Sequence, residues 1–153
     1  MKITFKFKVL CKVHFFSLAA VFLMGLCWQS SVLAEVAVIA HPSASISSID
    51  AATLRSIYMG KLKLWPDGSI LTVVDQGAGS KIRIRFIDEI IGKTERKFDA
   101  YWSRKAFSGK GVLLKKPGNG VDVKIWVSKY KGSIGYIDSS MVDASVKVLM
   151  TIK

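Results

Sequence analysis

Short apolar runs and helical apolar patterns alternate along residues 35–153. Val36–Ala40 and Ile70–Val74 are almost uninterrupted apolar runs of strand length. Runs without alternating polar residues are typical of strands buried on both faces. Elsewhere, apolar residues recur every three or four positions, which is the period of a helix. The alternation predicts an α/β domain with a mixed, largely parallel sheet and helices on both faces.

Capping residues and glycines set the expected bounds of these elements. Ser48 or Asp50 can cap a first helix, which Gly60 ends. The pattern predicts three more helices: Gly79 to Gly92, one that begins near Glu95, and Val121–Tyr130. We expect Val36–Ala40 and Ile70–Val74 to be the central strands, with further strands at Val112–Leu114, Gly132–Ile137 and Ser145–Ile152.

The first 34 residues follow a different pattern. Lysines precede a short apolar run, Phe15–Cys27, and Val32-Leu33-Ala34 follows it. This order is typical of a secretory signal peptide cleaved after Ala34. An uncleaved membrane anchor is the alternative, but the run is shorter than the roughly 20 residues that span a bilayer. We therefore expect residues 1–34 to be a signal peptide and residues 35–153 to be one periplasmic domain without a membrane span.

Composition narrows the classes of partner. The chain carries a formal net charge of +12, and both cysteines, Cys11 and Cys27, lie in the expected signal peptide. The exported part therefore has no disulfide or thiol chemistry. Excess positive charge favours anionic partners, such as phosphate or a lipopolysaccharide. Export argues against a nucleic-acid partner.

Residues suited to catalysis are scarce. His41 is the sole histidine of residues 35–153, and no His, Cys or carboxylate spacing typical of a metal site occurs. Asp88 and Glu89 are adjacent on a predicted helix, where neighbouring side chains diverge. We expect neither an enzyme nor a metal or other cofactor.

The strongest candidate site is the glycine-rich turn between Ile70–Val74 and the second predicted helix. Glycines let backbone amides converge, and the first helical amides attract anions. Two serines after the first strand could face this turn. The candidate ligand-binding residues are Gly77, Ala78, Gly79, Ser80, Lys81, Arg83, Ser43 and Ser45.

Several stretches together resemble one known family. Ile57–Lys61 with Trp65–Gly68 is similar to a segment of the periplasmic phosphate-binding proteins of ABC transporters. Gln76–Ser80 falls where that family has a phosphate-binding turn at the start of a helix. The stretches that follow in the family's order are Trp102, Gly109–Gly111, Gly118–Val121 and Gly132–Ile137. The resemblance implies one lobe of a type 2 periplasmic binding protein.

The resemblance also implies a function and shows departures from the family. It implies recognition of inorganic phosphate or a similar oxyanion, with an ABC permease or other envelope protein as partner. Here Val74 stands where the family has a phosphate-binding arginine, and Ala78 replaces a serine. The first lobe has no counterpart, so a second copy of the chain could be needed to close the site. The alternative is a non-catalytic interaction module of the cell envelope that kept the fold but lost the ligand.

Overall fold

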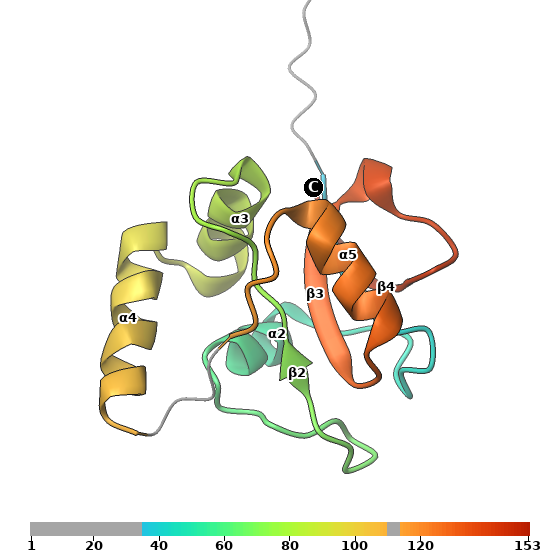
Figure 1. The fold of residues 1–153 in the computed structure, drawn as a ribbon, viewed down its shortest axis with the longest axis horizontal. Coiled ribbons are helices and arrows are strands. Elements are labelled where there is room, and N and C mark those ends of the chain that lie inside the picture. Colours follow the sequence, from blue (N-terminus) through green and yellow to red (C-terminus); the bar gives the residue numbers. More distant parts are fainter. Residues whose placement is uncertain (1–34, 110–113) are drawn as a thin grey trace, which may run out of the picture. The chain divides into compact units, whose positions relative to one another are not determined.

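The computed structural model describes residues 35–109 and 114–153 (Figure 1). The expected signal peptide, and most of the expected strand Val112–Leu114, lie outside the described residues. In chain order the elements are β1 (Val36–Ala40), α2 (Ala51–Tyr58), β2 (Thr72–Val73), α3 (Lys81–Phe86), the π-helical turn η1 (Ile87–Ile91), α4 (Glu95–Phe107), α5 (Gly120–Lys129), β3 (Ser133–Asp138), the 3-10 turn η2 (Ser139–Met141) and β4 (Lys147–Ile152).

The sheet is mixed, as predicted, but it is mostly antiparallel rather than largely parallel. Its strand order is β2-β3-β1-β4. β1 runs antiparallel to both β3 and β4, and only β2 and β3 are parallel. The reason is that β2 does not return beside β1 after α2. Instead, the neighbours of β1 are β3 and β4 from the C-terminal part of the chain, and both are antiparallel to β1.

The apolar run Ile70–Val74 is therefore not a central strand. β2 has two residues and lies at the sheet edge, and the Ile70 side chain is 75% exposed. β1 is central and fully buried, as its sequence predicts. Val36–Ala40 and Ile70–Val74 look alike in sequence because the apolar composition of a strand does not depend on how many strands pair with it.

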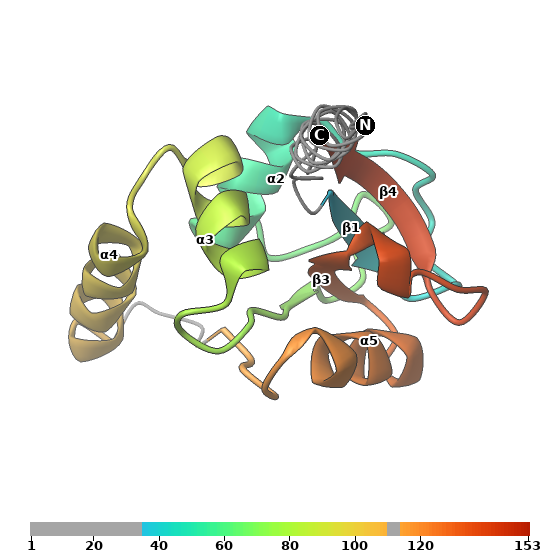
Figure 2. The same ribbon diagram turned by 90° about the horizontal axis from the view of Figure 1, so that it is seen from above.

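Helices cover both faces of the sheet, as predicted (Figure 2). Alternate residues of β1 supply the two faces. Val36, Val38 and Ala40 pack in a cluster with residues of α2, α3 and η1. Ala37 and Ile39 pack in a second cluster with Val123 and Val127 of α5. The sheet is thus the middle layer between two apolar cores.

The expected helices form, with polar caps at their starts. Asp50 caps α2 by accepting a hydrogen bond from the Thr53 amide at 2.8 Å, and Thr94 caps α4. Gly92 ends η1 in a left-handed conformation, with φ of 66°. Within the described residues, no helix has both the length and the apolar character needed to cross a membrane.

Helix α4 is attached to the carboxyl end of α2. The Tyr101 hydroxyl donates to the Met59 carbonyl at 2.8 Å, and the Trp102 indole N–H donates to the Tyr58 carbonyl at 3.2 Å. The Lys105 ammonium adds a 2.8 Å hydrogen bond to Met59 O. These donors satisfy carbonyls that the end of α2 leaves without helical partners. The contact holds α4 beside α2, and this matters for the site described next.

Candidate functional site

The glycine-rich turn leads from the end of β2 into α3, as the sequence predicts. The Gly77 amide donates to Gly118 O at 2.8 Å, and Gly79 has a φ of 80°. Ser80 is the N-cap of α3, and its hydroxyl accepts from the Arg83 amide at 3.4 Å. The same hydroxyl donates to the Gln76 side-chain carbonyl at 2.7 Å. The turn is therefore held by its own hydrogen bonds.

The outer part of this turn faces solvent. Ala78, Gly79 and Lys81 are exposed. In residues 35–109 and 114–153, the amides of Lys81 and Ile82 have no hydrogen-bond acceptor. These amides lie in the first turn of α3, where the peptide dipoles favour negative charge. The Lys81 side chain adds a positive charge beside them.

Arg83 does not reach out from this turn, contrary to its expected role as a ligand-binding charge. Its side chain is fully buried. Its Nη2 lies 3.0 Å from Asp75 Oδ2 and 2.6 Å from Asp99 Oδ1, and its Nη1 pairs with Glu95 Oε1. A buried guanidinium needs such partners to offset its lost hydration. The positive charge of Arg83, which we expected to bind an external anion, is therefore already paired with three carboxylates of the protein.

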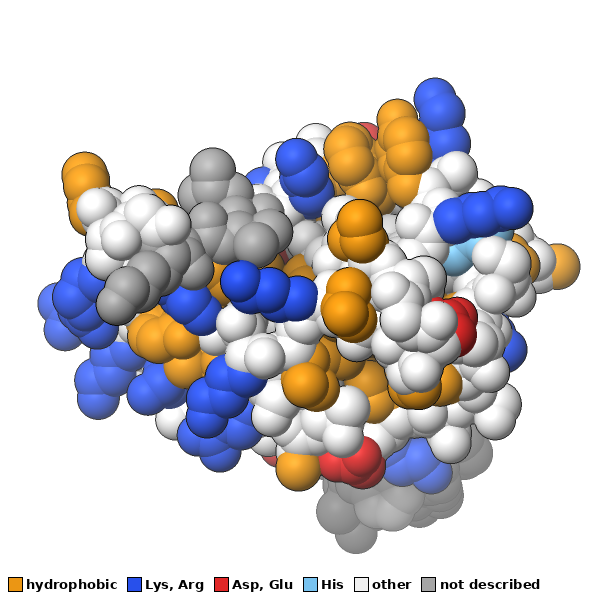
Figure 3. Space-filling view, turned by 90° about the horizontal axis from the view of Figure 1, so that it is seen from below, with side chains coloured by type: hydrophobic (Ala, Val, Ile, Leu, Met, Phe, Trp, Pro, Cys, Tyr) orange, Lys and Arg blue, Asp and Glu red, His pale blue; other side chains and the backbone are white. Residues whose placement is uncertain are grey.

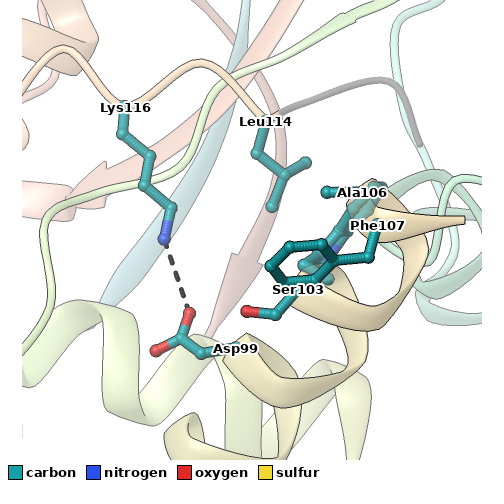
Figure 4. Close-up of a pocket in the computed structure, with 7 residues that line it drawn as sticks. Asp99, Ser103, Ala106, Phe107, Leu114 and Lys116 are labelled. Carbon is teal, nitrogen blue, oxygen red and sulfur yellow. Dashed lines mark hydrogen bonds and ion pairs between the residues drawn. The ribbon is translucent and has the colours of Figure 1, made fainter. Parts of the chain in front are cut away.

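We call Asp75, Arg83, Glu95, Asp99 and Lys116 the Arg83 cluster. The Lys116 ammonium lies 3.5 Å from Asp75 Oδ2 and 3.4 Å from Asp99 Oδ1. Both residues line a hollow of about 640 Å³ beside α4. Figure 4 shows the Lys116 side chain extending to Asp99. Burial lowers the pKa of Arg83, but hydrogen bonds to Asp99 and Asp75 outweigh it and raise the pKa above its usual value. The cluster therefore keeps Arg83 charged.

The sheet also holds this cluster. The Tyr136 hydroxyl donates to Asp75 Oδ1, and the Tyr136 carbonyl accepts from the Gln76 side-chain amide at 2.9 Å. Burial and the nearby Asp75 raise the pKa of Tyr136 well above its usual value, so its hydroxyl remains a donor. Sequence reasoning missed this cluster. A usable signal was the pair Glu95 and Asp99, because residues four apart share one helix face.

One turn amide is already occupied by a carboxylate of the protein itself. The Gly79 amide donates to Glu95 Oε1 at 3.0 Å, and the same oxygen pairs with Arg83 Nη1. Glu95 is the first residue of α4, and its side chain is 22% exposed. The anionic group bound at this turn is therefore the carboxylate of Glu95, a side chain of the protein itself.

The structure does not bring Ser43 and Ser45 to the turn. They follow β1, whose last residue Ala40 pairs with Ile134 near the start of β3. The turn lies toward the other end of β3, since β2 runs parallel to β3. Ser43 instead contacts His41 Nδ1 at 2.8 Å, and Ser45 lies near Asp67. The expectation failed because β1 is antiparallel to its neighbours.

The Val74 side chain lies inside the protein. It is fully buried in the α5-side core with Val123 and Val127. A charged arm at this position would be buried among apolar side chains. The family that the sequence resembles has an arginine at this position. The apolar surroundings of Val74 are consistent with a valine here.

A different surface lies at the opposite end of the sheet, along residues 60–71. The side chains of Leu62, Leu64 and Ile70 are exposed and border an apolar hollow of about 240 Å³. Lys61 and Lys63 alternate with these leucines and are exposed as well. Figure 3 shows apolar side chains interspersed with basic ones on this end of the molecule.

Comparison with known proteins shows what this fold resembles. No family model and no curated protein sequence matches the chain. Solved structures do match. One is a substrate-binding protein assigned to phosphate ABC transport in Clostridium perfringens, solved with bound phosphate (24% identity, TM-score 0.61, covering 76% of this chain and 45% of that one). Another is an ABC-type phosphate transport receptor from Vibrio cholerae (20% identity, TM-score 0.59, 77% and 47% covered).

A third match is PstS from Borrelia burgdorferi, with 18% identity and a TM-score of 0.58, covering 76% of this chain and 47% of that one. These similarities establish the fold alone. The chain has the fold of one part of a phosphate-receptor-type solute-binding protein, and it spans less than half the length of the three proteins described. The matched proteins are binding proteins rather than enzymes.

Proposed function

We propose that this protein is an exported, solute-binding-like domain that recognises a small oxyanion, with inorganic phosphate as the first candidate. The fold shared with phosphate receptors supports the class of function. The observation that carries the proposal is the exposed start of α3, where the Lys81 and Ile82 amides have no partner among the described residues. Lys81 also carries an ammonium group on its exposed side chain, so backbone and side chain attract the same kind of ligand.

The proposed site consists of the turn Gly77–Ser80 together with Lys81. Gly77 and Gly79 shape the turn, Ala78 leaves its outer side open, and the Ser80 hydroxyl lies at the helix start. Backbone amides and one lysine make a shallow site without a bidentate clamp. We therefore expect modest affinity that weakens as salt screens the exposed charges.

Export and partners are part of the same proposal. The signal-peptide pattern of residues 1–34 supports a periplasmic location, where a solute-binding domain can meet a permease of the ABC class. The chain spans less than half of the phosphate receptors described above. Because Ala78, Gly79 and Lys81 leave the outer side of the turn exposed, a partner protein or a second copy of this chain is proposed to cover it.

Calorimetric titration of the purified protein with phosphate at low salt tests the ligand. We expect Lys81→Gln to weaken binding about two- to fivefold, because one exposed charge contact is worth that much. Lys61→Gln is the matched control, since it removes the same charge at the opposite end of the sheet and should leave binding unchanged. Absence of binding heat with millimolar phosphate in the wild-type protein would overturn the oxyanion proposal.

The interaction module is the second candidate, and two observations favour it. The carboxylate of Glu95 already occupies the Gly79 amide. The apolar side chains of Leu62, Leu64 and Ile70 are exposed at the other end of the sheet. Exposed apolar clusters are common at protein interfaces. Without phosphate binding, this candidate becomes the preferred function.

A further inference from the structure

Glu95 holds two donors that come from a different part of the chain. Its Oε1 accepts from the Gly79 amide at 3.0 Å and from Arg83 Nη1. Gly79 belongs to the turn, Arg83 to α3, and Glu95 to the start of α4. One donor is the backbone amide of an exposed residue, and the other is a fully buried guanidinium. The amide of a surface glycine and a buried cation thus converge on one oxygen.

These two donors suit an oxyanion as well as a carboxylate. Both ligands present negatively charged oxygens to N–H groups, and such charge-assisted hydrogen bonds are the stronger class. In the structure, Glu95 takes this position. It also contributes to a cluster in which three carboxylates face Arg83 and Lys116, which disfavours an approaching anion. Glu95 therefore opposes an external oxyanion by occupancy and by charge.

The position of Glu95 allows its side chain to leave. It is the first residue of α4, and its side chain is 22% exposed. Arg83 would keep its contacts with Asp75 and Asp99 if Glu95 rotated into solvent. Helix α4 would stay attached to α2 through Tyr101, Trp102 and Lys105. Release thus requires a side-chain rotation rather than movement of a helix.

We propose that Glu95 is the residue that sets oxyanion affinity at the turn, by competing with the external ligand for the Gly79 amide and Arg83 Nη1. The inference rests on the proposed function, because it concerns the same turn. It adds a second pair of donors, which becomes available when the Glu95 carboxylate is absent or displaced.

The test is a phosphate titration of the purified protein at low salt, with Glu95→Ala, Glu95→Gln and the control Glu89→Ala. Glu89 is an exposed carboxylate on η1, so its removal changes the net charge equally without touching the turn. We expect Glu95→Ala to bind phosphate about tenfold more tightly than Glu89→Ala, since a hydrogen bond to a charged group has about that effect. Glu95→Gln, which keeps an acceptor but no charge, should give a smaller gain.

A second readout locates the ligand. In an amide ¹H–¹⁵N spectrum, phosphate should shift the Gly79 signal of Glu95→Ala more than that of Glu89→Ala. Tight binding by Glu95→Ala but none by the wild-type protein supports the inference and overturns the proposed function for the wild-type protein. Equal binding by Glu95→Ala and Glu89→Ala, or an unmoved Gly79 signal, overturns the inference even if the wild-type protein binds phosphate. If Glu95→Ala does not fold, Glu95→Gln decides by the same comparison.

Discussion

The glycine-rich turn and the Arg83 cluster are neighbours in sequence but opposite in character. The turn, Gly77–Ser80, is partly exposed and offers mainly backbone groups. The cluster begins two residues before the turn, at Asp75, and includes a fully buried arginine with three carboxylates. The basic residues near a turn are thus not all available to a ligand. In the structure Arg83 is paired within the fold, and its Nη1 becomes available to a ligand only if Glu95 leaves. Lys81, next to the turn, is exposed and can contact a ligand without breaking such a pair.

The difference has a physical cause. Once Arg83 lies inside the protein, it must be paired, because an unpaired buried charge is strongly unfavourable. Pairing consumes its donors and neutralises its charge. Lys81, two residues earlier, points into water and needs no partner. The two side chains project from α3 in different directions, so Arg83 has a structural role and Lys81 is the candidate ligand-binding cation.

Arg83→Met tests the cluster and should have the largest effect. It leaves the buried Asp75 without its main partner, so we expect a loss of about 3–5 kcal/mol in the free energy of unfolding. Urea denaturation measures this loss. The control Arg96→Met, at an exposed position of the same α4 that carries Glu95 and Asp99, should change stability by less than about 0.5 kcal/mol. Equal effects of the two variants would contradict the structural role of Arg83.

Val74→Arg tests whether an arginine can be placed next to the turn. Because Val74 is buried against Val123 and Val127, the new charge should lower the free energy of unfolding by about 3 kcal/mol. We expect no gain in phosphate affinity. Val148→Arg, at a 37% exposed position of β4, is the matched control and should be much milder. A stable Val74→Arg protein with tighter phosphate binding would show that this side chain can reach the turn.

Gly79→Ala and Gly77→Ala sharpen the description of the turn itself. A Cβ at Gly79 meets no atom within 4 Å, but the φ of 80° disfavours any other residue. We expect a stability loss of about 1 kcal/mol from this backbone strain. A Cβ at Gly77 meets only Gly118 O at 3.6 Å, an ordinary contact, so Gly77→Ala should cost less. Thermal denaturation compares the pair, and a reversed order would contradict this backbone geometry.

Asp99→Asn gives the smallest and most pH-dependent effect. Burial raises the pKa of Asp99, but the hydrogen bond and charge of Arg83 outweigh it, so the pKa is lowered from 3.8. A lowered pKa in the folded state means that ionised Asp99 stabilises the fold above about pH 4 and loses this effect in more acidic solution. The stability gap between wild type and Asp99→Asn should therefore narrow between pH 5 and pH 3, to be followed by urea midpoints. Asp88→Asn, at an exposed position, should show no such gap.

Local sequence alone was enough for the helices and for the class of fold. Asp50 and Gly60 mark the ends of the first helix, and Gly92 ends the second helical region. These signals act within a few residues, since a cap bonds to amides of its own helix. The fully buried β1 was also readable from Val36–Ala40. The glycine-rich turn formed where its sequence predicts, because a glycine at positive φ needs no distant contact.

Tertiary structure decided strand direction and the use of each charged side chain. The sequence Ile70–Val74 does not indicate that this strand lies at the edge of the sheet. The sequence after β1 likewise does not indicate that both neighbours of β1 are antiparallel to it. That pairing moved Ser43 and Ser45 to the far end of the sheet. Likewise, the sequence does not distinguish the role of Arg83 from that of Lys81. The difference comes from Glu95 and Asp99 of α4, which pair with Arg83 in the folded protein. Pairing partners far along the chain set these outcomes, because the free energy of a buried charge or strand depends on what packs against it.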